Sequence, residues 1–575
     1  MRKILSVVLA IGMALSVMSG CTNSTPENAA SSSAPESKAE SSSGVVNEFG
    51  WTVPEKTIEF SFYTGDDTVV NEAGMKVMAD YLKEKFNVVI NRIYYKQDMD
   101  ERLNLMLAQN DYPDVIVGMS DAMANQFIEQ GRALELSDLL KNYAPNWEKE
   151  MGNYTNLMRD DEGALYKMPM SWGNTTDTKG RDFGVRYDYW KETGLPMYDS
   201  FDSFYEVCKA ILEKHPTSPA GDKTYALTAS DKGREWFNTP LAYLGFKSGY
   251  KEADDGTLTH WVNTDEGLMI AKYINKFYRE GMIDPDWQNN VYDDAIEKFS
   301  SERVIANIGT WWHLYVGGHE TWITEAGYKP EKRFVNVPFQ QTDKTPTLIS
   351  DNYIRSTRTI ITDKCKNPEE VMTWFNFEVT PLGRALISNG PPDDTNVWNF
   401  KDGKITLSDK MVYGADINND FHAPREAHGA GLYWVAAPGY VPLENDDWST
   451  FGNPLIKTIH MWGWSYNMDK LDVARFPEAT AFQMKLDQTY ERPDFKWDAS
   501  LYTVTYPADS EEAILNVTIS ENIDSEWAKV VTAGSEAECE AAFLAMRDKL
   551  NQLGLKDLTA YAQSVISANI KKFNG

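Results

Sequence analysis

The sequence has few cysteines and few histidines, and this scarcity excludes several kinds of chemical site. The four cysteines, Cys21, Cys208, Cys365 and Cys539, are scattered and form no C-x-x-C pair. They predict neither a disulfide framework nor a thiolate zinc site. The seven histidines are dispersed, and we find no G-x-S-x-G, H-E-x-x-H or G-x-x-x-x-G-K-[ST] motif. We therefore expect no cofactor and no metal ion.

Basic residues are also fewer than acidic residues. The chain has 56 lysines and arginines against 85 acidic residues, which gives a formal net charge of -29. A nucleic-acid partner would require a basic patch for its phosphates, and an anionic bilayer would repel such a chain lying flat on it. We find no tandem repeat and, after the N-terminal segment, no apolar run long enough to span a membrane.

The N-terminal segment is typical of a secretory signal. Arg2 and Lys3 precede an uncharged apolar run from Ile4 to Met18, and two small residues follow before Cys21. The segment "VMSGC" resembles a bacterial lipoprotein signal, although such signals usually have Leu where Met18 stands. We predict a signal peptide over 1–20, a lipidated Cys21 and a disordered Ser/Ala/Glu tether over 21–54. An ordinary signal peptide with a chance cysteine is the alternative.

The order of predicted elements indicates an α/β fold. "KTIEFSFYTG" and "VIVG" have the character of buried strands, and the segments between them have helical periodicity. Alternating strands and helices predict a mainly parallel sheet, which binds ligands beyond the carboxyl ends of its strands. Those ends are Phe62 to Asp67 and Ile116 to Asp121. Near the C-terminus, Cys539, Phe543, Met546 and Leu550 share one helical stripe that ends at Gly554, and a second helix follows. We expect an αα-hairpin there.

Several segments, in order, resemble one protein family. They are "NDYPDVIVG", "GRALELSDLLKNYAPN", "GALYKMPM", "FGVRYDYWKETGLPMYDSFDSFYEVCKAI", "YINKFYREGMIDPDW", "EKFSSERVIANIGTWW" and "KCKNPEEVMTWFNF". Together they resemble the extracellular solute-binding lipoproteins of carbohydrate ABC importers in Gram-positive bacteria. The resemblance implies an α/β, two-lobed, periplasmic-binding-protein-like (type II) fold with an interlobe ligand cleft. It places the first lobe at 55–167 and 348–392, and the second lobe at 168–347 and 393–575.

Two segments were compared with calcium-binding loops. Many relatives have an Asp-rich, calcium-like loop where this chain has "KHPTSPAGD", which lacks alternating Asp and Asn ligands. "DINND", from Asp416 to Asp420, alternates acidic and amide residues, but it lacks the Gly and Glu of an EF-hand loop. Neither segment is expected to bind calcium.

Aromatic and polar side chains in polar segments are the candidate ligand-binding residues. A pyranose has an apolar C–H face that flat rings can cover and a rim of hydroxyls that polar groups can satisfy. Trp311 and Trp312 are the strongest candidates, because the family places an aromatic platform in a Gly-Thr-aromatic loop. Any single Trp can instead be a packing residue. The full set of predicted ligand-binding residues is Tyr63, Asp66, Asp67, Trp172, Asn174, Trp236, Trp311, Trp312, Asp351, Trp434, Trp462 and Trp464.

Three other residues have predicted roles or positions. Arg358 is a weaker candidate for ligand contact. Trp374 fits a helical stripe and is expected in the core, whereas Trp147, after "NYAPN", is expected to be a surface lid.

The resemblance implies a protein that captures a carbohydrate, with an oligosaccharide favoured by the number of candidate aromatics, and delivers it to ABC transporter permease subunits. It also implies attachment to the extracellular face of the cell membrane through the N-terminal lipid (palmitate), and no nucleic-acid partner. Two alternatives remain open. One is a secreted carbohydrate-active enzyme with paired carboxylates, because acidic doublets are plentiful. The other is a lipoprotein that binds a peptide or another solute.

Overall fold

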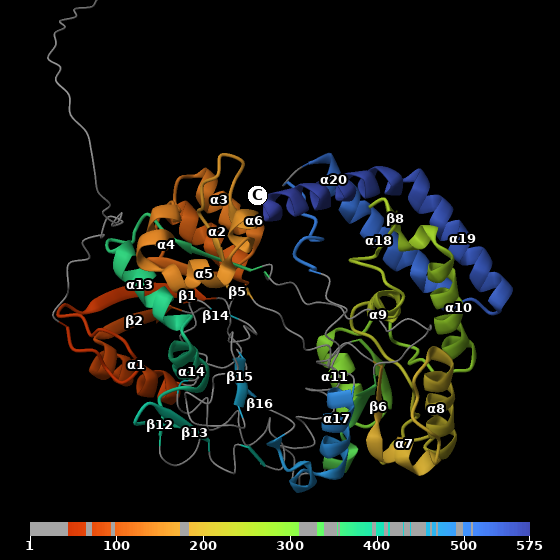
Figure 1. Ribbon diagram of the computed structural model, residues 1–575. Helices are drawn as coiled ribbons and strands as arrows, with labels where there is room; N and C mark the ends of the chain where they lie inside the picture. Colours follow the sequence, from red (N-terminus) through yellow and green to blue (C-terminus); the bar gives the residue numbers. More distant parts are fainter. Residues whose placement is uncertain are drawn as a thin grey trace, which may run out of the picture. The chain divides into compact units, whose positions relative to one another are not determined.

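Figure 1 shows the computed structural model of the chain. The structure describes residues 44–64, 72–93, 98–172, 183–309, 330–337, 354, 357–393, 398–407, 412–413, 429, 437–438, 456–460, 463–466, 470–489, 498–507 and 510–575. Of residues 171–172, 330, 437–438, 456–460, 463–466 and 487–489, only the backbone is described. No helix within these ranges is both long enough and apolar enough to cross a membrane.

The first sheet has five strands in the order β2-β1-β3-β11-β4. Their bounds are β1 (Ile58–Thr64), β2 (Val88–Ile93), β3 (Val115–Met119), β4 (Met168–Pro169) and β11 (Arg358–Ile361). β1 pairs in parallel with β2 and β3, and β11 runs antiparallel to both β3 and β4. The predicted, mainly parallel α/β sheet is therefore present, with one strand reversed.

Helices cover both faces of this sheet. On one face, Phe60 and Phe62 of β1 lie in a core cluster with Leu82 of α1 (Glu72–Phe86) and Trp374 of α13 (Pro368–Glu378). On the other face, Ile116 of β3 clusters with residues of α2 (Met99–Gln109) and α3 (Asp121–Glu129). The central strand β3 is apolar on both sides because both of its sides are buried. The other helices of this half are α4 (Ser137–Tyr143), α5 (Pro145–Met151), α6 (Tyr154–Met158) and α14 (Pro381–Asn389).

The second sheet has three strands in the order β10-β6-β9, with antiparallel pairing throughout. They are β6 (Phe183–Arg186), β9 (Ala306–Ile308) and β10 (Phe334–Val337). Parallel bridges extend the sheet, since Tyr225 pairs with Val304 and Leu227 with Ile283. The helices around it are α7 (Tyr187–Thr193), α8 (Phe201–Lys214), α9 (Glu235–Tyr243), α10 (Asp265–Arg279), α11 (Tyr292–Ser300) and α17 (Glu478–Thr489).

The chain ends in three helices: α18 (Glu511–Val531), α19 (Glu536–Gln552) and α20 (Leu555–Asn574). The predicted stripe of α19, from Cys539 to Leu550, is buried in the core cluster of the second sheet. The expected αα-hairpin of α19 and α20 is wrong, because α19 packs along α18, whereas α20 leads away from α19 to contact α6 and β8. Gly554 joins the two helices with a φ of 109°, a left-handed conformation that glycine adopts without strain. Helix α18 itself was not predicted from the sequence.

Short strands and 3-10 turns complete the described chain. They are β5 (Ser171–Trp172), β7 (Tyr250–Glu252), β8 (Leu258–His260), β12 (Trp398–Lys401), β13 (Lys404–Leu407), β14 (Ala437–Pro438), β15 (Ile456–His460), β16 (Gly463–Tyr466), η2 (Trp261–Asn263), η4 (Pro330–Lys332) and η7 (Val473–Arg475).

Two segments pack differently from the predicted domain boundaries. Phe49 and Trp51, assigned to the tether, are buried in the core cluster of the first sheet, where the Trp51 indole donates to the Phe86 carbonyl. Trp398 and Phe400, assigned to the second lobe, pack against Phe49 with ring centroids 6.4 and 5.2 Å apart. The end of the tether was predicted from the polar composition of 21–54. That prediction did not take account of the apolar residues Phe49 and Trp51 near the end of this segment. The other predicted boundaries stay predictions, and 1–43 lies outside the described residues.

Candidate functional site

One edge of the first sheet gathers the ends of all its parallel strands. β1 and β3 run side by side and end there at Thr64 and Met119, and β4 ends there at Pro169. β11 begins at the same edge, because Arg358 lies opposite both Met119 and Pro169. The predicted residues Asp66 and Asp67 follow Thr64 in the sequence but lie outside the described residues.

An ionic cluster occupies this edge. Oδ1 of Asp121, the first residue of α3, accepts hydrogen bonds from Arg358 Nε at 2.6 Å and from Lys167 Nζ at 2.8 Å. Lys167 also donates to Asn125 at 2.8 Å. The guanidinium of Arg358 is nearly buried, whereas 27% of the Asp121 side chain remains exposed. The cluster thus contains a partly exposed carboxylate that is bonded to two more deeply buried cations.

The neighbouring cations decide the protonation state of Asp121. Burial acts to raise the pKa of this carboxyl, but the charges and hydrogen bonds of Arg358 and Lys167 outweigh burial and lower the pKa. Burial lowers the pKa of the Lys167 ammonium, against the opposing attraction of Asp121. At neutral pH the edge therefore offers an ionised carboxylate, which is a strong acceptor for hydroxyl groups.

The second sheet has an equivalent edge. β9 ends at Ile308 and β10 at Val337, and both residues lie opposite Phe183, the first residue of β6. Gly309 follows with a φ of 82°, and a Cβ there would lie 2.0 Å from Thr239 Oγ1 on α9. Only glycine fits this close approach, so the chain leaves β9 directly against α9. The predicted Trp311 and Trp312 follow in sequence, outside the described residues.

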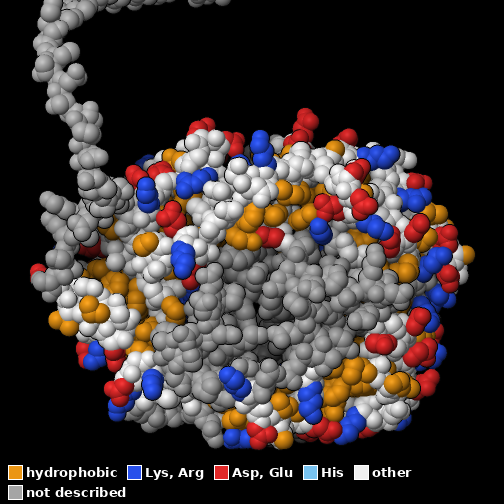
Figure 2. Space-filling model, viewed as in Figure 1, with side chains coloured by type: hydrophobic (Ala, Val, Ile, Leu, Met, Phe, Trp, Pro, Cys, Tyr) orange, Lys and Arg blue, Asp and Glu red, His pale blue; other side chains and the backbone are white. Residues whose placement is uncertain are grey.

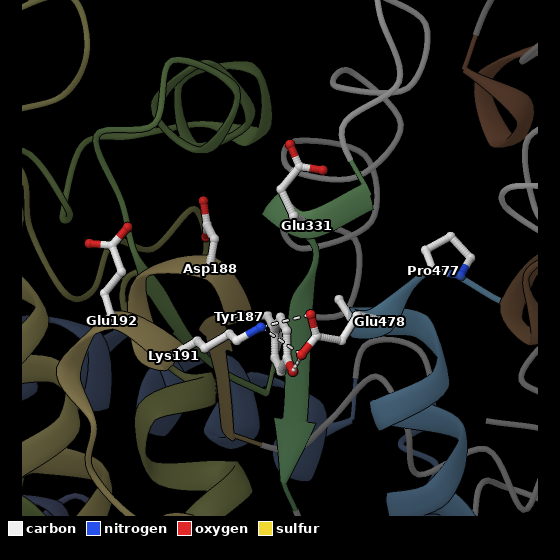
Figure 3. A pocket seen from close by; sticks show the side chains of 8 residues that line it. Tyr187, Asp188, Lys191, Glu192, Glu331, Pro477 and Glu478 are labelled. Carbon is white, nitrogen blue, oxygen red and sulfur yellow. Dashed lines mark hydrogen bonds and ion pairs between the residues drawn. The ribbon is translucent and has the colours of Figure 1, made fainter. Parts of the chain in front are cut away.

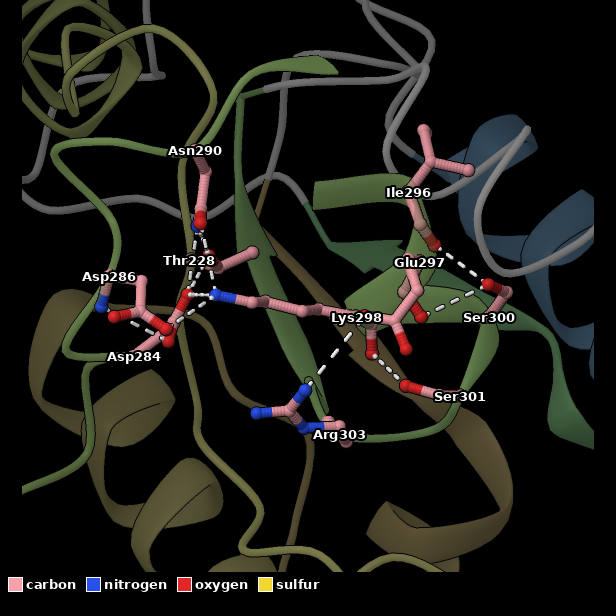
Figure 4. Close-up of polar contacts among 10 residues, drawn as sticks. All are labelled: Thr228, Asp284, Asp286, Asn290, Ile296, Glu297, Lys298, Ser300, Ser301 and Arg303. Atoms are coloured by element: carbon pink, nitrogen blue, oxygen red, sulfur yellow. Dashed lines mark hydrogen bonds and ion pairs between the residues drawn. The ribbon is translucent and has the colours of Figure 1, made fainter. Parts of the chain in front are cut away.

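A buried polar network lies at the same edge of the second sheet (Figure 4). Asp284 comes directly after a bridged extended segment and accepts hydrogen bonds from Lys298 at 2.7 Å and from Thr228 at 2.6 Å. Burial acts to raise the pKa of Asp284, but the hydrogen bonds from Lys298, Thr228 and Asn290 outweigh it and lower the pKa. This network was not predicted from the sequence, although an acidic residue directly after the apolar residues of "GMID" could have indicated it.

Two predicted ligand-binding residues are buried side chains in this structure. Tyr63 lies in the core cluster that α2 and α3 form with β3. Trp236 is 2% exposed and packs against Trp287, with ring centroids 4.9 Å apart. Both are positioned as packing residues, and nothing in the structure supports a ligand contact for either. Trp374 is buried as predicted, but the prediction for Trp147 is wrong, since this side chain is 1% exposed against Phe375.

The remaining predicted residues cannot be placed by their side chains. Trp172 and Trp464 belong to β5 and β16, of which only the backbone is described; β5 pairs with β14 and β16 with β15. The following predicted residues lie outside the described residues: Asn174, Asp351, Trp434, Trp462 and Cys21. Asp416 to Asp420 also lie outside them. Among the described residues, no group of three or more His, Cys, Asp or Glu side chains could hold a metal ion.

A pocket of about 520 Å³ lies elsewhere on the second half (Figure 3). Lys191 and Tyr187 of α7 point toward the carboxylate of Glu478 on α17 and donate to it at 2.7 and 3.0 Å. α7 starts where β6 ends, and β9 and β10 begin at that edge. The pocket is therefore at the opposite edge of the second sheet from Gly309 and is not the predicted binding site.

The described surface carries both signs of charge. On the face shown in Figure 2, acidic and basic side chains are interspersed over the described surface, and hydrophobic side chains form small areas between them. This mixture accompanies an overall charge of -29.

Comparisons with known sequences identify relatives of the chain. Residues 67–381, more than half of the chain, match the family described as bacterial extracellular solute-binding protein. The fructooligosaccharide ABC transporter substrate-binding protein FusA of Streptococcus pneumoniae serotype 4 is 25% identical over 243 residues, 39% of this chain and 45% of FusA. Lipoprotein LipO of Bacillus subtilis is 27% identical over 206 residues, 33% of this chain and 37% of LipO. The matched regions thus span less than half of these relatives.

Solved structures show the same fold over most of the chain. FusA of S. pneumoniae in complex with kestose has a TM-score of 0.62 at 15% identity, covering 89% of this chain and 99% of that one. The alginate-binding protein AlgQ2 without calcium ion has a TM-score of 0.59 at 18% identity, covering 90% and 99%. The predicted two-lobed type II α/β fold is confirmed, and the family confirms a binding protein over an enzyme. The chain belongs to the bacterial extracellular solute-binding protein family.

Proposed function

We propose that the chain captures an oligosaccharide between its two lobes and delivers it to the permease of an ABC importer. The observation that carries the proposal is the arrangement of the strand ends. Each sheet has a polar cluster at the edge where its strands β1 and β3, or β9 and β10, end. These clusters are Asp121 with Lys167 and Arg358 on the first sheet and Asp284 with Lys298 on the second. α/β sheets bind ligands at such edges.

Position in the sequence supports a contribution from the predicted residues beyond these edges. Asp66 follows Thr64 by two residues and Trp311 follows Gly309 by two, so both come soon after the end of a strand in the sequence. Carboxylates and aromatic rings are the groups that a sugar's hydroxyl rim and C–H face require.

The relatives' names support the class of ligand. FusA is named for fructooligosaccharides and has been solved with kestose, and AlgQ2 is named for alginate. These names say what those proteins bind. For this chain they favour an oligosaccharide over a peptide, and lobe closure around the sugar would be the switching motion.

The decisive experiment is calorimetric titration of the full chain with a panel of oligosaccharides, monosaccharides and short peptides. We expect binding by an oligosaccharide, tighter than by its monosaccharides. Replacing Trp311 or Trp312 with Ala should weaken binding several-fold, since an aromatic contact contributes about 0.5 to 1.5 kcal/mol beyond area burial. Binding of peptides alone would contradict the proposal.

We also propose that the chain is held at the extracellular face of the membrane by lipid on Cys21. The sequence up to Cys21 supports this, as does the relative LipO, which is named a lipoprotein. The native protein should partition into detergent, and Cys21→Ala should release it into the medium. A native protein that begins at another residue and carries no lipid would overturn this proposal.

A further inference from the structure

Lys298 is surrounded by oxygen atoms at the binding edge of the second sheet. Its Nζ donates to Asp284 Oδ2 at 2.7 Å, to Asn290 Oδ1 at 3.0 Å and to Asp286 Oδ2 at 3.3 Å. An ammonium group has three hydrogens to donate, so its capacity is filled. Figure 4 shows the side chain extending from α11 to meet these acceptors.

The network is buried and joins segments that are distant in sequence. The Lys298 side chain is 8% exposed and that of Asp284 is fully buried. Asp284 Oδ2 also accepts from Thr228 Oγ1 at 2.6 Å and from Asn290 Nδ2 at 2.9 Å, and Asn290 Nδ2 in turn donates to Thr228 Oγ1 at 2.9 Å. The ammonium group therefore ties helix α11 to the loop at 284–290, and Asp284 and Asn290 of that loop in turn bond Thr228, where the second loop begins.

Aromatic packing extends this link along both loops. Trp287 of one loop packs against Trp236, which follows the other loop on α9. Gly233 has a φ of 73°, and a Cβ there would lie 2.8 Å from Trp236 and 3.0 Å from Trp287. Asp231 closes the turn by accepting from the amides of Gly233 and Glu235 at 3.0 Å. The two loops and the start of α9 thus form one packed unit.

This unit supports the exit from β9. Thr239 and Glu235 of α9 are the side chains against which Gly309 packs. Since Gly309 directly precedes the segment with Trp311 and Trp312, a shift of α9 would move the starting point of that segment.

We propose that Lys298 is a positioning residue for solute binding: its ammonium group acts as an internal cation that fixes the loops at 228–236 and 284–290, and through them α9 and the backbone at Gly309. The proposal rests on the proposed function in locating the solute at this edge. Its cation chemistry is independent of which solute binds. The oxygen atoms around Nζ are of the kind that hard cations prefer.

The test compares Lys298→Ala with Lys191→Ala in the full chain. Lys191 is a matched control because its ammonium also bonds a carboxylate, Glu478, but on the surface and at the opposite edge. Thermal unfolding is measured without sugar in ethylammonium chloride, calcium chloride or choline chloride at equal ionic strength. We expect Lys298→Ala to melt at least 5 °C below the unmodified protein, and ethylammonium or calcium, but not choline, to restore part of that loss. Lys191→Ala should show neither effect.

Sugar affinity provides the second readout. Lys298→Ala should bind at least tenfold more weakly than the unmodified protein, and ethylammonium should recover part of that loss. If Lys298→Ala does not fold, Asn290→Ala, which removes one acceptor and leaves both carboxylates, should show a smaller affinity loss of about threefold. Unchanged melting and affinity in Lys298→Ala, or no recovery with any small cation, would overturn the proposal. Cation rescue of melting in a chain whose unmodified form binds no sugar would instead overturn the proposed function.

Discussion

The two polar clusters at the sheet edges have opposite construction. On the first sheet, one carboxylate, that of Asp121, lies between the two cations Lys167 and Arg358. On the second, one ammonium group, that of Lys298, lies among Asp284, Asp286 and Asn290. The Asp121 side chain is 27% exposed, whereas that of Asp284 is fully buried.

This difference in burial separates two roles. A saturated, buried ion network cannot exchange partners without leaving a charge unpaired, which makes it suited to holding loops in place. A partly exposed carboxylate that is already ionised by its neighbours can accept a solute hydroxyl without losing its supporting contacts. We therefore interpret the cluster on the first sheet as one that binds the solute, and the cluster on the second sheet as one that holds the loops in position.

The largest expected effect is in the buried network. Asp284→Ala would leave the Lys298 ammonium buried with weaker acceptors, and removing one partner of a buried ion pair typically costs about 3 to 5 kcal/mol. Denaturant unfolding should show a loss of that size. Asp286→Ala is the control, because its side chain is 66% exposed and should change stability by less than about 1 kcal/mol. Equal losses of unfolding free energy in Asp284→Ala and Asp286→Ala would contradict a structural role for the buried network.

A smaller effect concerns pH and His260 of β8 in the second half. Burial lowers the pKa of this imidazole to about 4. In the unfolded chain the pKa is about 6.5, so between pH 6.5 and 4 the unfolded state binds more protons and stability falls as pH falls. We expect a loss of about 1 to 3 kcal/mol over this range. His260→Phe should flatten the profile above pH 4, and an unchanged profile in that variant would contradict the assignment.

The exposed cluster on the first sheet should matter less for folding than for binding. Asp121→Asn keeps the shape of the side chain but removes the charge between Lys167 and Arg358. We expect a stability loss of about 1.5 to 3 kcal/mol, because hydrogen bonds to charged groups contribute about that much. Sugar affinity should fall several-fold in the same variant. A stability loss as large as that of Asp284→Ala, with unchanged affinity, would reverse the roles assigned to the two clusters.

The smallest effect is expected at the pocket between α7 and α17. The ion pair of Lys191 and Glu478 is more than half exposed on both sides, and such pairs typically contribute less than about 1 kcal/mol. Hydrogen bonds from Lys191 and Tyr187 lower the pKa of the Glu478 carboxyl, and the opposing effect of burial is smaller. Glu478→Gln should therefore leave the melting temperature within about 2 °C and sugar affinity unchanged. A clear affinity loss would show that this pocket takes part in solute binding.

Local patterns predicted elements well where burial follows a regular period. β3 is buried along nearly its whole length, as the run "VIVG" predicts for a strand inside a parallel sheet. The stripe of Cys539, Phe543, Met546 and Leu550 is the buried face of α19. In both cases the spacing of the apolar residues in the sequence matches the spacing of the buried positions in the element. The local sequence is therefore enough to predict the element and its buried side.

Individual aromatic side chains were harder to interpret. Trp236 stands in a polar stretch, "GREWFN", that indicated a surface position, yet Trp287, distant in sequence, covers it. Trp147 lies in the short helix α5 and is covered by Phe375 of α13. A single Trp carries no periodicity, so its environment depends on segments that the local sequence does not contain.

The amino-acid sequence alone was enough to predict the alternation of strands and helices, the buried stripe of α19, the acidic balance and the family, because these depend on local composition and on the order of residues along the chain. Which helix lies against α19, and which charges meet, depended on the packing of the folded chain. Asp121 and Arg358 are 237 residues apart, and Thr228 and Asp284 are 56 apart. Ion pairs and buried networks form between side chains that the sheet brings to one edge, and no local pattern encodes that contact.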